Sequence, residues 1–120
     1  MSTGVNVVNQ LETTMRQAIT GNHFSDADGN PAGGHTTGIG IDIQWQNGPL
    51  GRGESRQPAN GAFVEGVIAA AVDRLEFYQR GKFACRENAL AITKLQEAMH
   101  WCQHRTADRE ARQVEGTHAV

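Results

Sequence analysis

The sequence lacks the features of a membrane or secreted protein. None of its apolar runs is long enough to cross a bilayer, and residues 1–10 have neither the basic start nor the long apolar core of a signal peptide. An excess of positive charge is also missing, because 11 Lys and Arg face 13 Asp and Glu and the net charge is −2. We therefore expect no membrane partner and no coating of long nucleic acid, although a local phosphate site is compatible with this balance.

Cysteine is scarce as well. The two cysteines, Cys85 and Cys102, stand 17 residues apart in one predicted helix. A disulfide requires Cα atoms within about 7 Å, so these thiols cannot bridge each other in a straight helix. We interpret both as packed thiols of a protein that works in a reducing cytosol.

What is present divides into a β-like first half and a helical second half. The length indicates one domain, residues 1–120, whose small core would gain from oligomerisation. Ile39–Gln46 alternates apolar and polar residues and is predicted as a strand. Gly21–Gly38 is rich in turn dipeptides and is predicted as a loop. Val5–Ile19 is compatible with a short strand or loose start followed by one or two helical turns.

Two long helices are predicted in the second half. Phe63–Arg80 carries a broad apolar stripe, with Asn60 as its N-cap and Gly81 as the residue after its end. Ala84–Ala111 contains neither Gly nor Pro and is rich in helix-forming residues. Since the connection between them is short, the two helices must turn back on one another.

The predicted fold class is therefore α+β. A small antiparallel β portion, residues 1–58, is followed by a long antiparallel α-helical hairpin, residues 59–120, that mediates oligomerisation. Self-association is predicted from a second stripe on the outer face of the second helix, which holds two large apolar side chains: Leu90, Lys94, Glu97 and Trp101. The alternative is that the N-terminal segment covers this stripe within one chain.

Arginines gather at the far end of the second predicted helix. Its apolar stripe, which starts at Ala84 and includes Asn88, ends in Arg105, Arg109 and Arg112. A packed face that turns basic can hold an anion, because a guanidinium binds phosphate through two parallel hydrogen bonds. The alternative is a solvated helix end, where the arginines pair with acidic neighbours and complement the helix dipole.

Other side chains suit a nucleotide. Arg52 and Arg56 stand in a Gly-rich loop whose backbone can approach a ligand closely. The rings of Phe77 and Tyr78 can stack on a base, and the amide of Asn88 can pair with a base or a ribose. The alternative for both rings is packing in the core of the hairpin.

Signals for catalysis or metal binding are weak. His100 and His104 have the spacing of a zinc-binding pair on a helix, but no third ligand is evident. Asp26–Asn30 resembles the start of a calcium loop, but Pro31 occupies the position that requires Gly. His35 opens one H-x-T element, whereas the phosphodiesterases that use this element need two. We therefore expect a binding protein without catalytic residues, metal or cofactor.

The end of the chain carries the most specific pattern. The segment CRENALAITKLQEAMHWCQHRTADREARQVEGTH, residues 85–118, resembles the helical hairpin domain shared by two families of phage immune-evasion proteins, Thoeris anti-defence protein 1 and anti-CBASS protein 2. The segments IDIQWQNGPLGRG and NGAFVEGVIAAAVDRLEFYQ resemble the first of these, which adds a small β portion before the hairpin. The resemblance covers residues 38–118 and gives no account of residues 1–37.

The resemblance implies a function. Proteins of this kind bind the nucleotide second messenger of a bacterial defence system tightly, without cleaving it, in the cytoplasm of the host bacterium. The implied ligands are cyclised ADP-ribose isomers, with cyclic di- or trinucleotides at a separate site in some members. The implied assembly is a homodimer, or a hexamer built as a trimer of dimers, with pockets between protomers. The alternatives are a phosphodiesterase that degrades the same signals and a helical oligomer without a ligand.

The resemblance also implies which side chains bind. Asn88 and the aromatic residues at the end of the first helix fall where the family contacts its ligand, and Arg105 and Arg109 fall where it holds phosphates. One position departs from the family, because Gln113 stands where Gly is usual, and this could alter how the tail leaves the helix. The full predicted ligand-binding set is Arg52, Arg56, Phe77, Tyr78, Asn88, Arg105, Arg109, Arg112, Thr117 and His118.

Overall fold

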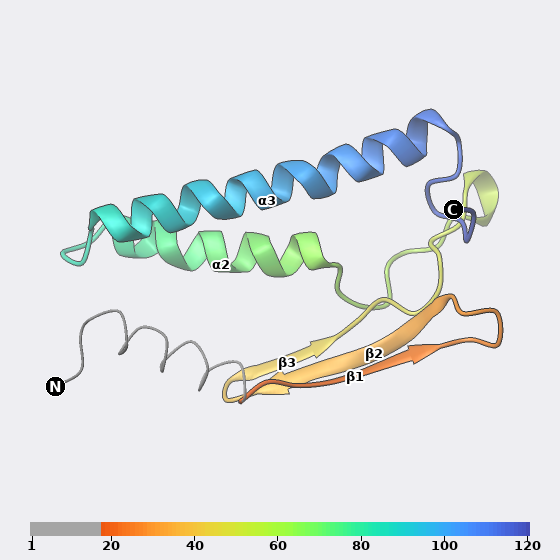
Figure 1. The fold of residues 1–120 in the computed structure, drawn as a ribbon, viewed down its shortest axis with the longest axis horizontal. Coiled ribbons are helices and arrows are strands. Elements are labelled where there is room, and N and C mark those ends of the chain that lie inside the picture. The colour runs from red at the N-terminus through yellow and green to blue at the C-terminus, as the bar shows by residue number, and fades with distance from the viewer. Residues whose placement is uncertain (1–17) are drawn as a thin grey trace, which may run out of the picture. The chain divides into compact units, whose positions relative to one another are not determined.

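The computed structural model describes residues 18–120, so the prediction for Val5–Ile19 lies almost entirely outside the described residues. The chain divides after Gly48 into two compact units (Figure 1). The first contains a three-stranded antiparallel sheet and the second a helical hairpin, so the predicted α+β class is confirmed. Neither helix of the described residues is long and apolar enough to cross a membrane.

The sheet has its strands in the order β1-β2-β3: β1 (Thr20–Ser25), β2 (Pro31–Gly38) and β3 (Ile41–Gln44). β3 lies within the predicted strand Ile39–Gln46, but β1 and β2 occupy Gly21–Gly38, where the prediction of a loop was wrong. Only the middle of that stretch turns. There the carboxylate of Asp26 accepts the N–H groups of Asp28 and Asn30 at 2.9 and 3.0 Å and closes the β1–β2 hairpin.

Glycine in β2 explains why these strands escape sequence reasoning. Gly34 has a φ of 137°, and a Cβ at this residue would lie 2.3 Å from the carbonyl oxygen of Asn22 on β1. Glycine alone permits this approach of two backbones. Pairing on both sides holds β2 extended, and the Trp45 indole donates to the Thr36 hydroxyl at 2.8 Å. Strand pairing therefore overrides the low strand propensity of glycine.

The second unit holds a short 3-10 helix, η1, and the two helices of the hairpin: η1 (Gly53–Ser55), α2 (Val64–Gln79) and α3 (Arg86–Ala111). The predicted hairpin is confirmed (Figure 1). Gln79 closes the connection, because its side-chain amide accepts the N–H of Cys85 at 2.9 Å and donates to the Cys85 carbonyl at 3.0 Å. The prediction of Asn60 as N-cap was wrong, since α2 begins directly after Phe63, and Glu65 in its first turn complements the helix dipole.

The facing sides of the two helices are half-buried. On α3 the half-buried residues follow much of the predicted stripe, but Ile92 and Met99 join it, while Ala98 and Arg105 are exposed. Among residues 18–120 no residue is fully buried, and large apolar side chains such as Phe77, Leu90 and Trp101 remain exposed. A single copy of the chain therefore leaves its core incomplete.

Candidate functional site

The predicted ligand-binding side chains form two groups at opposite ends of the hairpin. Phe77 and Tyr78 near the end of α2, and Asn88 in the first turn of α3, lie beside the connection between the two helices, here called the aromatic end. Arg105, Arg109 and Arg112 lie where α3 stops, here called the arginine end. Figure 1 shows these two ends of the hairpin. Asn88 and Arg105 are 17 residues apart on α3, which corresponds to about 25 Å along the helix axis at roughly 1.5 Å per residue. One hairpin therefore cannot bring both groups to a ligand the size of a nucleotide.

An arginine that sequence reasoning missed joins the aromatic end. The guanidinium carbon of Arg74 lies 4.8 Å from the ring centroid of Phe77 and 4.9 Å from that of Tyr78, and its Nε donates to the Tyr78 hydroxyl at 3.2 Å. The three- and four-residue spacing on one helix was the signal that could have found it. An exposed cation–π contact is worth about 0.5–1 kcal/mol, so a stacking ligand can displace Arg74 from the rings.

Asn88 completes the aromatic end. It is half-buried in the first turn of α3, and its Nδ2 donates to the carbonyl of Phe83 at 3.4 Å. This distance is long for an N–H···O bond, so the amide can turn toward a ligand at little cost. A ring pair, an amide and a guanidinium are thus available together at this end of the hairpin.

At the opposite end, α3 stops in a Schellman motif whose left-handed residue is not glycine. The N–H of Val114 donates to the carbonyl of Arg109 at 3.0 Å, and the N–H of Gln113 donates to that of Glu110 at 2.9 Å. Gln113 has a φ of 58°, the conformation in which glycine is usual at this position. The tail therefore leaves α3 by the route that a glycine would allow, and Gln113 is strained.

Replacing Gln113 by Gly is expected to stabilise the protein by about 1 kcal/mol. A left-handed backbone costs a residue with a Cβ roughly 1–2 kcal/mol, and the greater freedom of glycine in the unfolded chain offsets part of the gain. Urea titrations of the two proteins give the difference. Gln103→Gly, an exposed position inside α3, is the control and should lose about 1 kcal/mol. A Gln113→Gly protein no more stable than the parent would contradict the assignment of strain.

Arg109 holds the C-terminal tail, residues 113–120. Its Nη2 donates to the carbonyls of Val114 and Thr117, both at 3.0 Å, and its Nη1 donates to the carbonyl of Ala119 at 2.8 Å. In the part of the chain that the structure describes, no carboxylate lies within ion-pair distance of this guanidinium. It therefore makes no direct ion pair there, although the Glu115 carboxylate lies near enough to interact with its charge.

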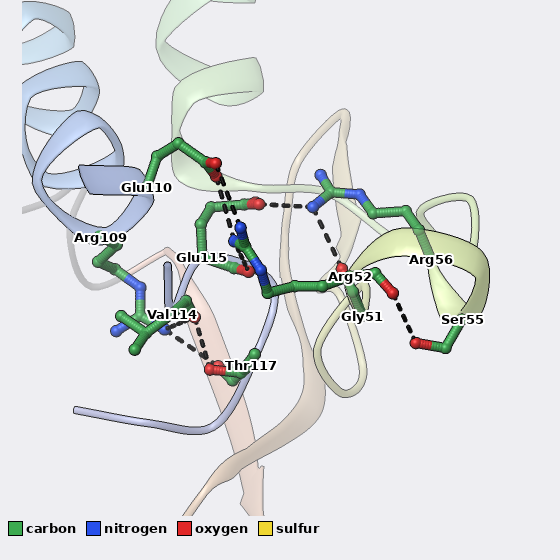
Figure 2. A network of polar contacts seen from close by, with 9 residues as sticks. All are labelled: Gly51, Arg52, Ser55, Arg56, Arg109, Glu110, Val114, Glu115 and Thr117. Atoms are coloured by element: carbon green, nitrogen blue, oxygen red, sulfur yellow. Dashed lines mark hydrogen bonds and ion pairs between the residues drawn. The ribbon is translucent and has the colours of Figure 1, made fainter. Parts of the chain in front are cut away.

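Two arginines from the segment before α2 reach the tail as well (Figure 2). Arg52 makes a two-pronged ion pair with Glu110, at 3.2 and 3.3 Å, and also donates to the carbonyl of Glu115 at 2.9 Å. Arg56 pairs with the Glu115 carboxylate and donates to the carbonyl of Gly51. The hydrogen bond from Arg56 lowers the pKa of Glu115 below its ordinary value, so this pair is intact at neutral pH and is lost as the pH falls through the lowered pKa.

A backbone contact joins the same two segments. The N–H of Gly51 donates to the carbonyl of Gly116 at 2.7 Å. Both glycines have positive φ, 86° and 78°, and a Cβ on Gly116 would lie 2.4 Å from the Gly51 carbonyl oxygen. Position 116 therefore requires glycine. The sequence shows both glycines but not that they meet.

Thr117 and His118 differ in their surroundings. Thr117 is half-buried, and its hydroxyl donates to the carbonyl of Val114 and accepts the N–H of Ala119 at 3.1 Å. His118 is exposed to solvent. The tail is thus curled around Thr117, with its carbonyl turned to Arg109 (Figure 2).

The remaining two arginines are held more loosely. Arg105 pairs with Glu65 of α2, 3.1 Å from its Nη2, and its side chain is 66% exposed. Arg112 pairs with Asp108 one turn earlier at 3.2 Å and donates to the carbonyl of Val120. Exposed pairs of this kind contribute about 0–1 kcal/mol, so a phosphate can replace the carboxylate.

The histidine pair on α3 forms an aromatic cluster. The rings of His100 and His104 stand edge-on to Trp101, with centroids 6.3 and 5.9 Å away. Within residues 18–120 there is no group of three or more His, Cys, Asp or Glu side chains that could hold a metal ion.

Known proteins share this hairpin. A sequence model described as "Acb2/Tad1, hairpin domain" matches residues 37–107, which is more than half of the chain. The chain belongs to the Acb2/Tad1 hairpin domain family. The Acb2/Tad1 match contains the whole aromatic end together with Arg52, Arg56 and Arg105, and it stops before Arg109 and the tail.

A relative carries a more specific name. The protein "Thoeris anti-defense 1" of Bacillus phage SBSphiJ7 is 49% identical over 76 residues, which make up 63% of this chain and 51% of the relative. The chain thus spans about half the length of this curated relative. The identity agrees with membership of the Acb2/Tad1 hairpin domain family.

Proposed function

We propose that the protein is a phage anti-defence protein that binds and sequesters a cyclic nucleotide-derived immune messenger without cleaving it. The expected ligands are cyclised ADP-ribose isomers, with cyclic di- or trinucleotides at a further kind of site. The observation that carries the proposal is the family match, which includes Tyr78, Asn88 and Arg105 and is joined by a relative named for anti-defence. The expected place of action is the cytoplasm of the host bacterium.

The two ends of the hairpin offer complementary chemistry for such a ligand. At the aromatic end, Phe77 and Tyr78 present faces to an adenine, and stacking is worth about 1–3 kcal/mol per base. Asn88 can pair with the base or the ribose. At the arginine end, Arg105 can exchange Glu65 for a phosphate, and the guanidinium of Arg109 contacts neutral carbonyls. Charge-assisted bonds to phosphate are about twice as strong as neutral hydrogen bonds.

The binding pocket is proposed to form between two copies of the chain. The two ends lie about 25 Å apart along α3, so an antiparallel pair of hairpins would place the aromatic end of one copy beside the arginine end of the other. The lack of any buried residue among residues 18–120, with Leu90 and Trp101 exposed, supports self-association. The proposed assembly is a homodimer or a hexamer built as a trimer of dimers.

Sequestration is favoured over hydrolysis by the groups present. A guanidinium stays protonated at neutral pH, so the arginines can bind phosphate but cannot act as bases. The H-x-T element is engaged in the sheet, where the ring of His35 packs edge-on against Phe24 at 5.9 Å and the Thr36 hydroxyl accepts the Trp45 indole. A protein that only binds must lower the free messenger by mass action, so its affinity must be high.

Recovery of the ligand tests this function. The purified protein is mixed with cyclised ADP-ribose and a panel of cyclic di- and trinucleotides and filtered, and the retained fraction is heated and analysed by mass spectrometry. Intact messenger in an amount comparable to the protein supports sequestration. A cleaved product would instead support the phosphodiesterase, and an empty retained fraction would leave a helical oligomer without a ligand.

The unfolding temperature is expected to rise with protein concentration. Since residues 18–120 include none that is buried, much of the stability must come from association, and mass action then favours the folded state as concentration increases. Over a roughly hundredfold range, calorimetry should record a rise of several degrees. Sedimentation velocity on the same samples distinguishes dimer from hexamer. An unfolding temperature that stays constant would contradict the proposal that copies of the chain gain stability by associating.

A further inference from the structure

We propose that Arg52, Arg56, Glu110 and Glu115 form a clasp that holds the C-terminal tail in the shape that ligand binding requires. Arg52 and Arg56 are then positioning residues that act through the tail, and they do not themselves bind phosphate. The clasp is a property of the chain alone, whereas its role toward a ligand rests on the proposed function.

Two guanidinium groups converge on Glu115 (Figure 2). Arg52 binds its backbone carbonyl at 2.9 Å, and Arg56 binds its carboxylate. The Glu115 side chain is only 20% exposed, which makes it the most shielded member of the ion pairs at this end of the hairpin. Salt and water weaken a shielded pair less than a solvated one, so this contact is suited to hold a chain segment in place.

The charge balance argues against a phosphate at Arg52 and Arg56. Two guanidinium groups face two carboxylates, and both terminal nitrogens of Arg52 are engaged by Glu110. An incoming phosphate would have to displace carboxylates that are tethered in the same chain and so present at high effective concentration. Arg109, whose partners are neutral carbonyls, and the exposed Arg105 are better placed to receive it.

The tail connects the clasp to Arg109. Directly after Glu115 the chain turns at Gly116, whose carbonyl accepts the N–H of Gly51, and the next carbonyl, that of Thr117, lies 3.0 Å from Nη2 of Arg109. A tail released at Glu115 would lose the contacts of Gly116 with Gly51 and of Thr117 with Arg109. The Arg109 guanidinium and the Thr117 hydroxyl would then no longer be held in fixed directions.

A double-mutant cycle with a shortened chain tests the clasp. Arg52→Ala is made in the full chain and in a chain that ends at Gln113, with Asp28→Asn, an exposed position in the turn between β1 and β2, as the control. Hydrogen exchange of the Gly51, Thr117 and Ala119 amides is measured without ligand. Affinity for cyclised ADP-ribose is measured by calorimetry.

The clasp predicts one pattern of results. In the full chain, Arg52→Ala should speed exchange at the three amides and weaken ligand binding, each by about tenfold, the size of one net hydrogen bond. In the shortened chain the same substitution should leave affinity unchanged, because the tail through which Arg52 acts is gone. Asp28→Asn should change neither quantity.

Other patterns overturn it. Equal weakening by Arg52→Ala in both chains would mean that Arg52 touches the ligand, and unchanged amide exchange would mean that no clasp holds the tail. If the shortened chain does not fold, Arg56→Ala and Glu115→Gln replace it, and additive effects of that pair would overturn the clasp. If the parent protein binds no messenger, both the proposed function and the role of the clasp in binding are wrong. The amide exchange rates would still show whether the clasp exists.

Discussion

Arg109→Ala is expected to weaken messenger binding by about 100-fold or more, the upper range for the loss of one hydrogen bond to a charged group. The side chain has two tasks in the proposed site. Its guanidinium, whose hydrogen-bond partners are neutral carbonyls, can face a phosphate, and its three bonds to the carbonyls of Val114, Thr117 and Ala119 keep the tail in place. One substitution therefore removes both a ligand contact and the anchor of its neighbours.

Comparison with two other variants separates these tasks. Arg105→Ala should cost about tenfold, since it removes a charge-assisted bond but no tail contact. Arg109→Lys keeps the charge but lacks the planar fork that serves three carbonyls, so its affinity should fall between the parent and Arg109→Ala. Calorimetric titration with cyclised ADP-ribose measures all three, and Asp28→Asn, at an exposed position in the β1–β2 turn, is the control for a change of one charge. If Arg109→Ala binds as tightly as the parent, the phosphate assignment is wrong.

Gly116→Ala is expected to release the tail and, with it, most of the ligand affinity. A Cβ would meet the Gly51 carbonyl oxygen at 2.4 Å, and the backbone is already in the left-handed region at a φ of 78°. The strain amounts to about 1–2 kcal/mol before the clash is counted. If residues 114–120 detach from the rest of the chain, both the backbone strain and the clash are relieved. The free energy of unfolding therefore cannot fall by more than the free energy with which the tail binds the rest of the chain.

The measurement for this variant is local as well as global. Exchange at the Thr117 and Ala119 amides should approach that of an unfolded chain, while the amides of α2 keep their protection. Gly66→Ala in α2 is the matched control, because a Cβ at Gly66 meets nothing within 4 Å and the residue lies in ordinary helix. It should be about 0.5–1 kcal/mol more stable than the parent. Parent-like protection of the tail in Gly116→Ala would refute the close Gly51–Gly116 contact.

The helical hairpin could be predicted because its signals are local. The apolar stripe and Gly81 placed α2, and the absence of Gly and Pro placed α3, each to within two residues of its observed bounds. Helix hydrogen bonds join residues four apart, so a short window of sequence contains most of the information. The contacts at the aromatic end are also local. Arg74 could have been predicted in the same way, because it precedes Phe77 and Tyr78 by three and four residues on one helix.

The sheet could not be predicted in full. β3 has alternating apolar residues and was found, but β1 and β2 are built mostly from Thr, Gly, Asn and His. Their extended shape comes from pairing across the sheet, and Gly34 contributes by lacking a side chain. Glycine has no side chain to contribute to an apolar pattern, so hydrophobic periodicity cannot identify strands of this kind.

The amino-acid sequence alone settled the α+β class, the two helices and the kinds of side chain available to a phosphate and a base. It could not show which arginines are already engaged. Arg52 meets Glu110 and Glu115 across 58 and 63 residues of chain, and no local pattern records a contact at that separation. Only the folded chain, by docking the tail on the segment before α2, shows that Arg52 and Arg56 are paired with carboxylates of the same chain, whereas the hydrogen-bond partners of Arg109 are neutral carbonyls.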